Sequence, residues 1–180
     1  NLPEKNFYLS RYLDEEPLDA GEILKTILEI RDQLEQYRVN ASLYLDDEIS
    51  RDKKILFEGA QGTMLDVDHG TYPFVTSSNT TSAQAATGSG VGPKQLHTIL
   101  GITKAYTTRV GRGPFPSELF DEIGDSIQKN GADFGATTGR RRRCGWRDTV
   151  ILKNSVRLNG LTGRELTQLD ILGGRDSLNI

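Results

Sequence analysis

Segments with the apolar spacing of helices alternate along this chain with short apolar runs typical of strands. Helices are expected at residues 18–37, 94–106, 116–131 and 148–160, and strands at 53–59, 105–110 and 164–172. This alternation predicts an α/β fold with helices flanking a mainly parallel sheet. Ser117 is the expected N-cap of the third helix and Gly131 its expected end. We expect residues 1–180 to form a single α/β segment.

Composition excludes several classes of protein. The 180 residues are 36% hydrophobic, which is enough to bury a core, and no apolar run approaches the roughly 20 residues that span a bilayer. The formal net charge of -3 argues against a general nucleic-acid binder, because such proteins capture phosphates with basic patches. Cys144 is the only cysteine, so we expect no disulfide, no zinc site and a reducing, cytoplasmic setting. The chain begins at Asn1, as a processed protein or an excised fragment does.

A stretch rich in Gly, Thr and Ser at residues 60–94 has almost no periodicity, and long irregular loops are usually functional or disordered. Its segment GSGVGPK departs from a Walker A loop, because Pro93 separates Gly92 from Lys94 and Gln95 stands where Ser or Thr is required. We therefore interpret this segment as a tight turn into a helix.

The segment LDVDHG (Leu65–Gly70) groups Asp66, Asp68 and His69. The group suits a divalent cation or an acid–base pair, but Asp and Gly are also what a turn requires. We favour the polar turn. His97 is expected to be an exposed helix residue and Cys144 an unreactive thiol, although neighbouring arginines can lower a thiol pKa.

Four consecutive arginines, Arg140–Arg143, lie in the segment GATTGRRRRCGW. Each guanidinium matches two carboxylate or phosphate oxygens at once. Adjacent guanidinium groups repel one another unless an anion, or acidic groups of the protein, lies between them. A binding loop for carboxylate or phosphate is preferred over a solvated charged face. Further along, Asp170 stands where the [NT]-K-x-D element of GTPases has the aspartate that binds guanine.

Five blocks in this order resemble the adenylosuccinate synthetase family: ILFEGAQGTMLDVDHGTYPFVTSSNTT, GVGP, KAYTTRVGRGPFPSEL, FGATTGRRRRCGWRD and LTQLDIL. The likeness runs from about Lys54 to Leu172. It implies a P-loop GTPase-like α/β fold and a ligase of purine (AMP) biosynthesis that joins IMP and L-aspartate, using GTP and Mg²⁺. In that family the 6-oxygen of IMP is phosphorylated first, and the aspartate amine then displaces the phosphate. The resemblance also implies a homodimer of the intact enzyme, and no nucleic-acid or membrane partner is expected.

The resemblance assigns three sets of binding residues. Those for IMP are Gln61, Thr76, Val110 and Arg140; those for aspartate are Ala136, Thr137, Thr138, Gly139, Arg140, Arg141 and Arg142; those for GTP are Arg142, Gln168, Leu169 and Asp170. It implies that Gln61 orients the purine and that Asp170 binds guanine. No catalytic residue or Mg²⁺ ligand is expected in this chain, because the family's general base and acid lie upstream of the matched blocks.

Two departures from the family pattern bear on activity. Gln168 replaces a lysine, which weakens the expected GTP contact, and the Gly-rich loop GDEGKGK is absent. The chain thus resembles the middle of a synthetase, and we expect it to be inactive alone. Two alternatives remain: a degenerate, non-catalytic nucleotide- or anion-binding module and, least favoured, an RNA-binding protein that uses the arginine run.

Overall fold

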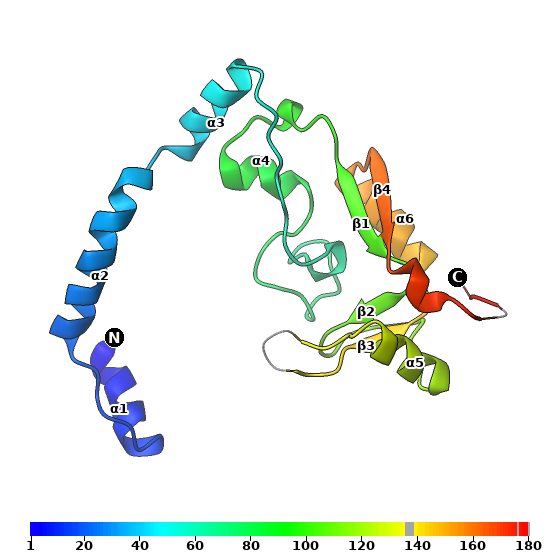
Figure 1. The fold of residues 1–180 in the computed structure, drawn as a ribbon, viewed down its shortest axis with the longest axis horizontal. Helices are drawn as coiled ribbons and strands as arrows, with labels where there is room; N and C mark the ends of the chain where they lie inside the picture. The colour runs from blue at the N-terminus through cyan, green and yellow to red at the C-terminus, as the bar shows by residue number, and fades with distance from the viewer. Residues whose placement is uncertain (136–138, 176, 180) are drawn as a thin grey trace. The chain divides into compact units, whose positions relative to one another are not determined.

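The computed structural model describes residues 1–135, 139–175 and 177–179 (Figure 1). Contacts divide the chain into two units, Asn1–Tyr44 and Leu45–Ile180. The single α/β segment over residues 1–180 stays a prediction. Among the described residues, no helix combines the length and the apolar character needed to cross a membrane.

The first unit is helical. It contains α1 (Leu2–Tyr12), α2 (Ala20–Leu34) and the 3₁₀ turn η1 (Glu35–Tyr37), and α3 (Ala41–Ser50) begins in it. The helix expected at residues 18–37 is therefore confirmed as α2 followed by η1. Asp19 begins α2, because its carboxylate accepts a hydrogen bond from the Glu22 amide at 2.9 Å. Neither α1 nor α2 has a buried residue.

The second unit contains two small sheets. Strands β1 (Leu100–Lys104) and β4 (Gly163–Thr167) pair in parallel, with Leu100 opposite Gly163 and Lys104 opposite Thr167. Strands β2 (Thr107–Arg109) and β3 (Arg143–Gly145) pair antiparallel. Because the parallel strands are far apart in sequence, helices and the other sheet lie in their crossover. The predicted α/β class, with helices and a parallel sheet, is confirmed.

The remaining elements of the second unit are short. They are α4 (Ala83–Ser89), α5 (Glu122–Asn130), α6 (Thr149–Asn159) and the 3₁₀ turns η2 (Thr63–Leu65), η3 (Pro93–Gln95) and η4 (Leu169–Leu172). The predicted helix at 148–160 is confirmed as α6, which Asp148 caps through the amides of Val150 and Ile151. In α5 the N-cap is Asp121, so the prediction of Ser117 was wrong, whereas the end at Gly131 is confirmed.

Two other element predictions were wrong, and the last predicted strand was confirmed as β4 but is shorter than expected. Residues 53–59 form no strand, and Leu56 is 92% exposed. Residues 94–106 form the end of η3 and then β1 instead of an α-helix. The segment GSGVGPK therefore leads into a 3₁₀ helix. Long-range packing favours the strand here, since a Cβ on Gly101 would lie 2.3 Å from Leu161 Cδ1. The last strand ends at Thr167, because Gln168 takes a left-handed φ of 56° and η4 follows.

The core of the second unit lies where the antiparallel β2–β3 pair, α5 and η4 meet. Its buried residues are Ala105, Tyr106, Ile127, Cys144 and Leu172, with Leu119, Trp146 and Ile171 packed against them. Figure 1 shows α5 beside β2 and β3, with η4 close by. The arginine run leads directly into β3, so this core supports it.

Candidate functional site

A buried carboxylate organises the polar loop that follows Gln61. Asp66 is fully buried, and it accepts hydrogen bonds from the amides of Asp68 and His69 at 3.0 Å and of Thr80 at 2.6 Å. Asn79 donates to both Asp66 and Asp68. Burial alone raises the pKa of Asp66, but these hydrogen bonds outweigh it and hold the pKa far below the usual range. The interpretation of LDVDHG as a polar turn therefore holds.

Arg109 joins this loop to the end of β2. Its Nη2 donates to Thr71 Oγ1 at 2.7 Å and to the Phe74 carbonyl at 3.1 Å. Burial, and then the charge of Arg143, lowers the pKa of Arg109. The segment Thr71–Phe74, which precedes Thr76, is thereby bound to Arg109, the residue before Val110.

The three predicted IMP contacts outside the arginine run differ in exposure. Val110 is 61% exposed, and Gln61 is exposed with a left-handed φ of 62°. Thr76 is half-buried, and its amide donates to the Leu65 carbonyl at 2.8 Å. The segment next to Gln61 is tied to the loop, because Thr80 Oγ1 donates to the Gly62 carbonyl at 2.7 Å.

Arg143, the last residue of the arginine run, uses its guanidinium for contacts within the protein. Its guanidinium makes a bidentate pair with Glu118 and donates to the carbonyls of Gly111 and Gly113. It also lies 5.3 Å from the ring centroid of Phe115. The hydrogen bond from Arg143 lowers the pKa of Glu118, and the same bond raises the pKa of Arg143. Arg143 thus holds the loop after β2 in place.

The preceding arginines are held more loosely. Arg141 pairs with Asp125 on α5 at 2.6 Å, and both side chains are largely exposed. Arg142 Nη1 lies 3.7 Å from Asp133, and its Nε is buried without a hydrogen-bond partner among the described residues. Arg140 is exposed, and its carbonyl accepts a hydrogen bond from Gly135. Acidic groups of the protein therefore separate the charges of Arg141, Arg142 and Arg143.

Part of the predicted aspartate loop lies outside the described residues, namely Ala136, Thr137 and Thr138. On one side of this gap Gly139 is exposed, and its amide donates to the Gly135 carbonyl at 2.8 Å. Phe134 and Arg141 form an isolated antiparallel bridge. These contacts hold together the described residues on the two sides of residues 136–138.

The predicted guanine contacts lie on the turn after β4. Leu169 and Asp170 are exposed at the start of η4, whereas Gln168 is half-buried. The Gln168 amide oxygen lies 3.2 Å from the Tyr106 hydroxyl, which donates to Asp133 at 2.6 Å. Through these contacts the turn at residues 168–170, here called the predicted guanine turn, is connected to the base of the arginine run.

Cys144 and His97 are the remaining side chains considered as candidates for a reactive or metal-binding role. Burial, and next the charge of Asp133, raises the pKa of Cys144 to about 11 despite the nearby cations. The neighbouring arginines therefore do not bring the pKa of Cys144 below its usual value, and the interpretation of Cys144 as an unreactive thiol stands. His97 is exposed as predicted, although it follows η3 instead of lying in a helix.

Possible metal ligands are not clustered in the described part of the chain. Within that part, no three His, Cys, Asp or Glu side chains are grouped to hold a metal ion. Both oxygens of Asp66 already accept backbone amides, so this carboxylate is not available as a ligand.

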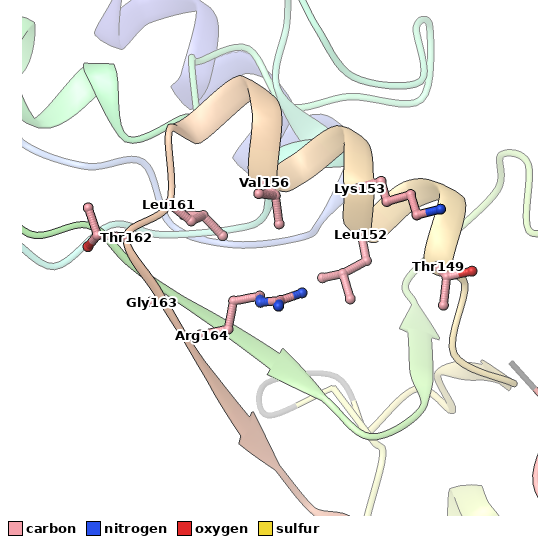
Figure 2. A pocket seen from close by; sticks show the side chains of 8 residues that line it. All are labelled: Thr149, Leu152, Lys153, Val156, Leu161, Thr162, Gly163 and Arg164. Carbon is pink, nitrogen blue, oxygen red and sulfur yellow. The ribbon is translucent and has the colours of Figure 1, made fainter.

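A groove of about 590 Å³ lies apart from all of these residues (Figure 2). Leu152 and Val156 of α6 line it together with Leu161 and with Arg164 of β4. None of the predicted binding residues contributes to its wall.

Sequence reasoning missed several residues that build the site. Arg109, Glu118, Tyr106 and Asp133 were not assigned, although the quoted motifs contain or adjoin them. A tyrosine or aspartate in a short motif carries no sign of burial, so only three-dimensional contacts identify Tyr106 and Asp133. Of these residues, Arg109 was the easiest to predict from the sequence, because it is a cation directly before Val110, a predicted IMP contact.

Comparison with known proteins gives a consistent result. The family model described as adenylosuccinate synthetase matches residues 1–180. Adenylosuccinate synthetase of Desulforapulum autotrophicum is 59% identical over 179 residues, which are 99% of this chain and 42% of that protein. The enzyme of Geobacter metallireducens is 57% identical over 180 residues, again 42% of its length. The chain thus spans less than half of these curated relatives.

A solved structure agrees with the sequence comparisons. The fully ligated adenylosuccinate synthetase from Plasmodium falciparum superposes with a TM-score of 0.85 at 37% identity. The match covers 89% of this chain and 38% of that one.

Proposed function

The chain belongs to the adenylosuccinate synthetase family, and from this we propose that the protein containing it joins IMP and L-aspartate at the expense of GTP. The product is adenylosuccinate, in the purine pathway to AMP. In the proposed reaction GTP phosphorylates the 6-oxygen of IMP, and the aspartate amine then displaces the phosphate. This chain supplies substrate contacts, and the full-length protein supplies the phosphoryl-transfer residues and the Mg²⁺ ligands.

One observation supports this assignment most directly. Pairing of β2 with β3 places Arg109 opposite Arg143, and Arg109 in turn binds the Thr71–Phe74 loop. Three motifs that are far apart in the chain, TYPFVTSSN, TTRVG and GRRRRCG, are thereby gathered at one place. A common IMP and aspartate site requires such a gathering.

The proposed IMP contacts follow from this arrangement. The neutral amide of Gln61 orients the purine, Thr76 contacts the phosphate and Val110 lines the nucleotide site. Arg140 faces both IMP and aspartate. Because a guanidinium fork fixes the orientation of a carboxylate, it holds the amine ready for attack.

The aspartate loop comprises residues 136–142. Arg141 can join it at little cost, because exposed ion pairs such as the one with Asp125 contribute little to stability. Arg142 reaches toward GTP, whose guanine is read by Asp170 with Gln168 and Leu169 beside it. Asp170 is exposed and so accessible to the base. We further propose that the full-length protein is a homodimer, which its mass in solution tests.

The test is Arg140→Ala in the full-length protein. The KM for aspartate is expected to rise roughly 10- to 100-fold, because a charge-assisted pair is lost, while the melting temperature stays within a few degrees. Arg157→Ala on α6 is the matched control, since Arg157 is exposed and bonds Asn154 only locally. Unchanged aspartate kinetics in Arg140→Ala would remove this loop from the site.

The isolated chain provides a second test. With IMP, GTP and aspartate it is expected to form no product, since it lacks the phosphoryl-transfer machinery. Product formation at an enzyme-like rate would refute that division of labour. Ligand binding without turnover by the full-length protein would instead support a non-catalytic binding module.

A further inference from the structure

A buried carboxylate, Asp133, lies at the base of the arginine run. Its side chain is 2% exposed, and one oxygen contacts both Lys104 Nζ and Arg142 Nη1, the latter at 3.7 Å. The main chain of Asp133 is fixed as well, because its carbonyl accepts the Arg142 amide at 2.9 Å and Gln128 Nε2 at 3.0 Å. A buried charge held this way restricts where Arg142 can lie.

The other oxygen of Asp133 accepts a 2.6 Å hydrogen bond from the Tyr106 hydroxyl. The position of this hydroxyl is closely defined, since a Cβ on Gly131 would lie 2.0 Å from it. The Tyr106 ring is buried in the core, and Lys104 Nζ lies 5.2 Å from its centroid. Tyr106 therefore has little freedom to move.

Gln168 completes the connection. Its amide oxygen lies 3.2 Å from the Tyr106 hydroxyl, whose single hydrogen is directed at Asp133. Because the oxygen and nitrogen of a glutamine amide can exchange places by a half-turn, the amide can donate to the phenol oxygen instead. Arg142 and Gln168 are thus linked through two buried side chains.

Building on the proposed function, we propose that Tyr106 and Asp133 are positioning residues that couple the aspartate loop to the predicted guanine turn. Asp133 sets the position of Arg142, and Tyr106 sets that of Gln168. Because the two residues share one hydrogen bond, displacement of either loop disturbs the other. Neither residue contacts the reacting atoms.

The test is Tyr106→Phe in the full-length protein, because phenylalanine keeps the buried ring and removes only the hydroxyl. The KM values for GTP and for aspartate are each expected to rise about 3- to 10-fold, as for the loss of one buried hydrogen bond. The KM for IMP is expected to stay within about twofold, because three of its four proposed contacts, Gln61, Thr76 and Val110, lie on other loops. Tyr37→Phe is the control, since Tyr37 is 72% exposed.

A double-mutant cycle separates positioning from a general loss of structure. Gln168→Ala is expected to raise the KM for GTP. Tyr106→Phe is expected to raise it by a smaller factor in this background than in the wild type, because only its effect through Arg142 remains. The double variant is expected to show the same raised KM for aspartate as Tyr106→Phe alone, because the hydroxyl that links Gln168 to Asp133 is already absent.

The outcomes are distinguishable. An active wild-type protein whose Tyr106→Phe variant keeps its KM values for GTP and aspartate would overturn the coupling alone. Equal increases in all three KM values, with a lowered melting temperature, would show a purely structural role and overturn it as well. A wild-type protein without synthetase activity would overturn the proposed function, and this inference with it.

Discussion

Glu118 and Asp125 each pair with an arginine of the same run, but in different surroundings. The side chain of Glu118 is 12% exposed and that of Asp125 is 74% exposed. Glu118→Gln leaves the positive charge of Arg143 without its carboxylate partner in a largely buried site. This substitution should therefore lower the free energy of unfolding by about 2–3 kcal/mol. Asp125→Asn, the matched control, should cost less than about 0.5 kcal/mol. Urea titration of both variants measures this, and equal losses would contradict the assignment of Arg143 to the scaffold.

Asp66 makes stability dependent on pH. Its pKa is lowered on folding, as is that of Glu118, so these carboxylates stabilise the folded state fully above their unfolded pKa values. Their contribution is lost as the pH falls toward the folded values. We expect the melting temperature to fall steeply below about pH 4. The Asp66→Asn variant should have a lower melting temperature at neutral pH, but its melting temperature should change less as the pH falls. Parallel melting curves against pH for the two proteins would refute this role.

At the scale of elements, the end of α6 fixes two distant segments. The Asn159 side chain accepts from the Ser82 amide at 2.7 Å and donates to Thr63 Oγ1 at 2.9 Å. Asn159 is nearly buried, so Asn159→Ala leaves these partners unsatisfied and should cost about 2–3 kcal/mol in the free energy of unfolding. Asn154→Ala on the same helix loses one local bond to Arg157 and should cost under about 1 kcal/mol. Similar losses on urea denaturation would mean that α6 does not anchor α4 and η2.

The elements also show what a sequence can predict. Helices α2 and α6 were predicted because the positions of their apolar residues are a local signal. Strand β1 was mistaken for a helix, because the contact that favours it, Gly101 against Leu161, joins residues far apart in the chain. The arginine run was interpreted as an anion site, which stays a prediction, and the acidic partners of Arg141 and Arg143 depend on folding. The coupling of Tyr106 with Asp133 depends on burial, which no short motif reveals.

At the scale of the whole chain, the two units differ in how much they bury. Helices α1 and α2 have 11 and 15 residues and no buried residue, whereas α5 buries Ile127 completely. Helices of about 12–15 residues are marginal in water without tertiary packing.

We therefore expect the amides of α2 to exchange with deuterium at least roughly 100-fold faster than those around Ile127 in α5, because local unfolding of α2 exposes little buried surface. Hydrogen-exchange mass spectrometry of this chain measures both helices in one sample, so α5 serves as the internal control. Repeating it at a roughly tenfold lower protein concentration separates intrinsic helix stability from self-association through exposed residues such as Leu24 and Ile27. Exchange in α2 as slow as in α5 at both concentrations would contradict this expectation, because it would require packing within the chain that protects the first unit.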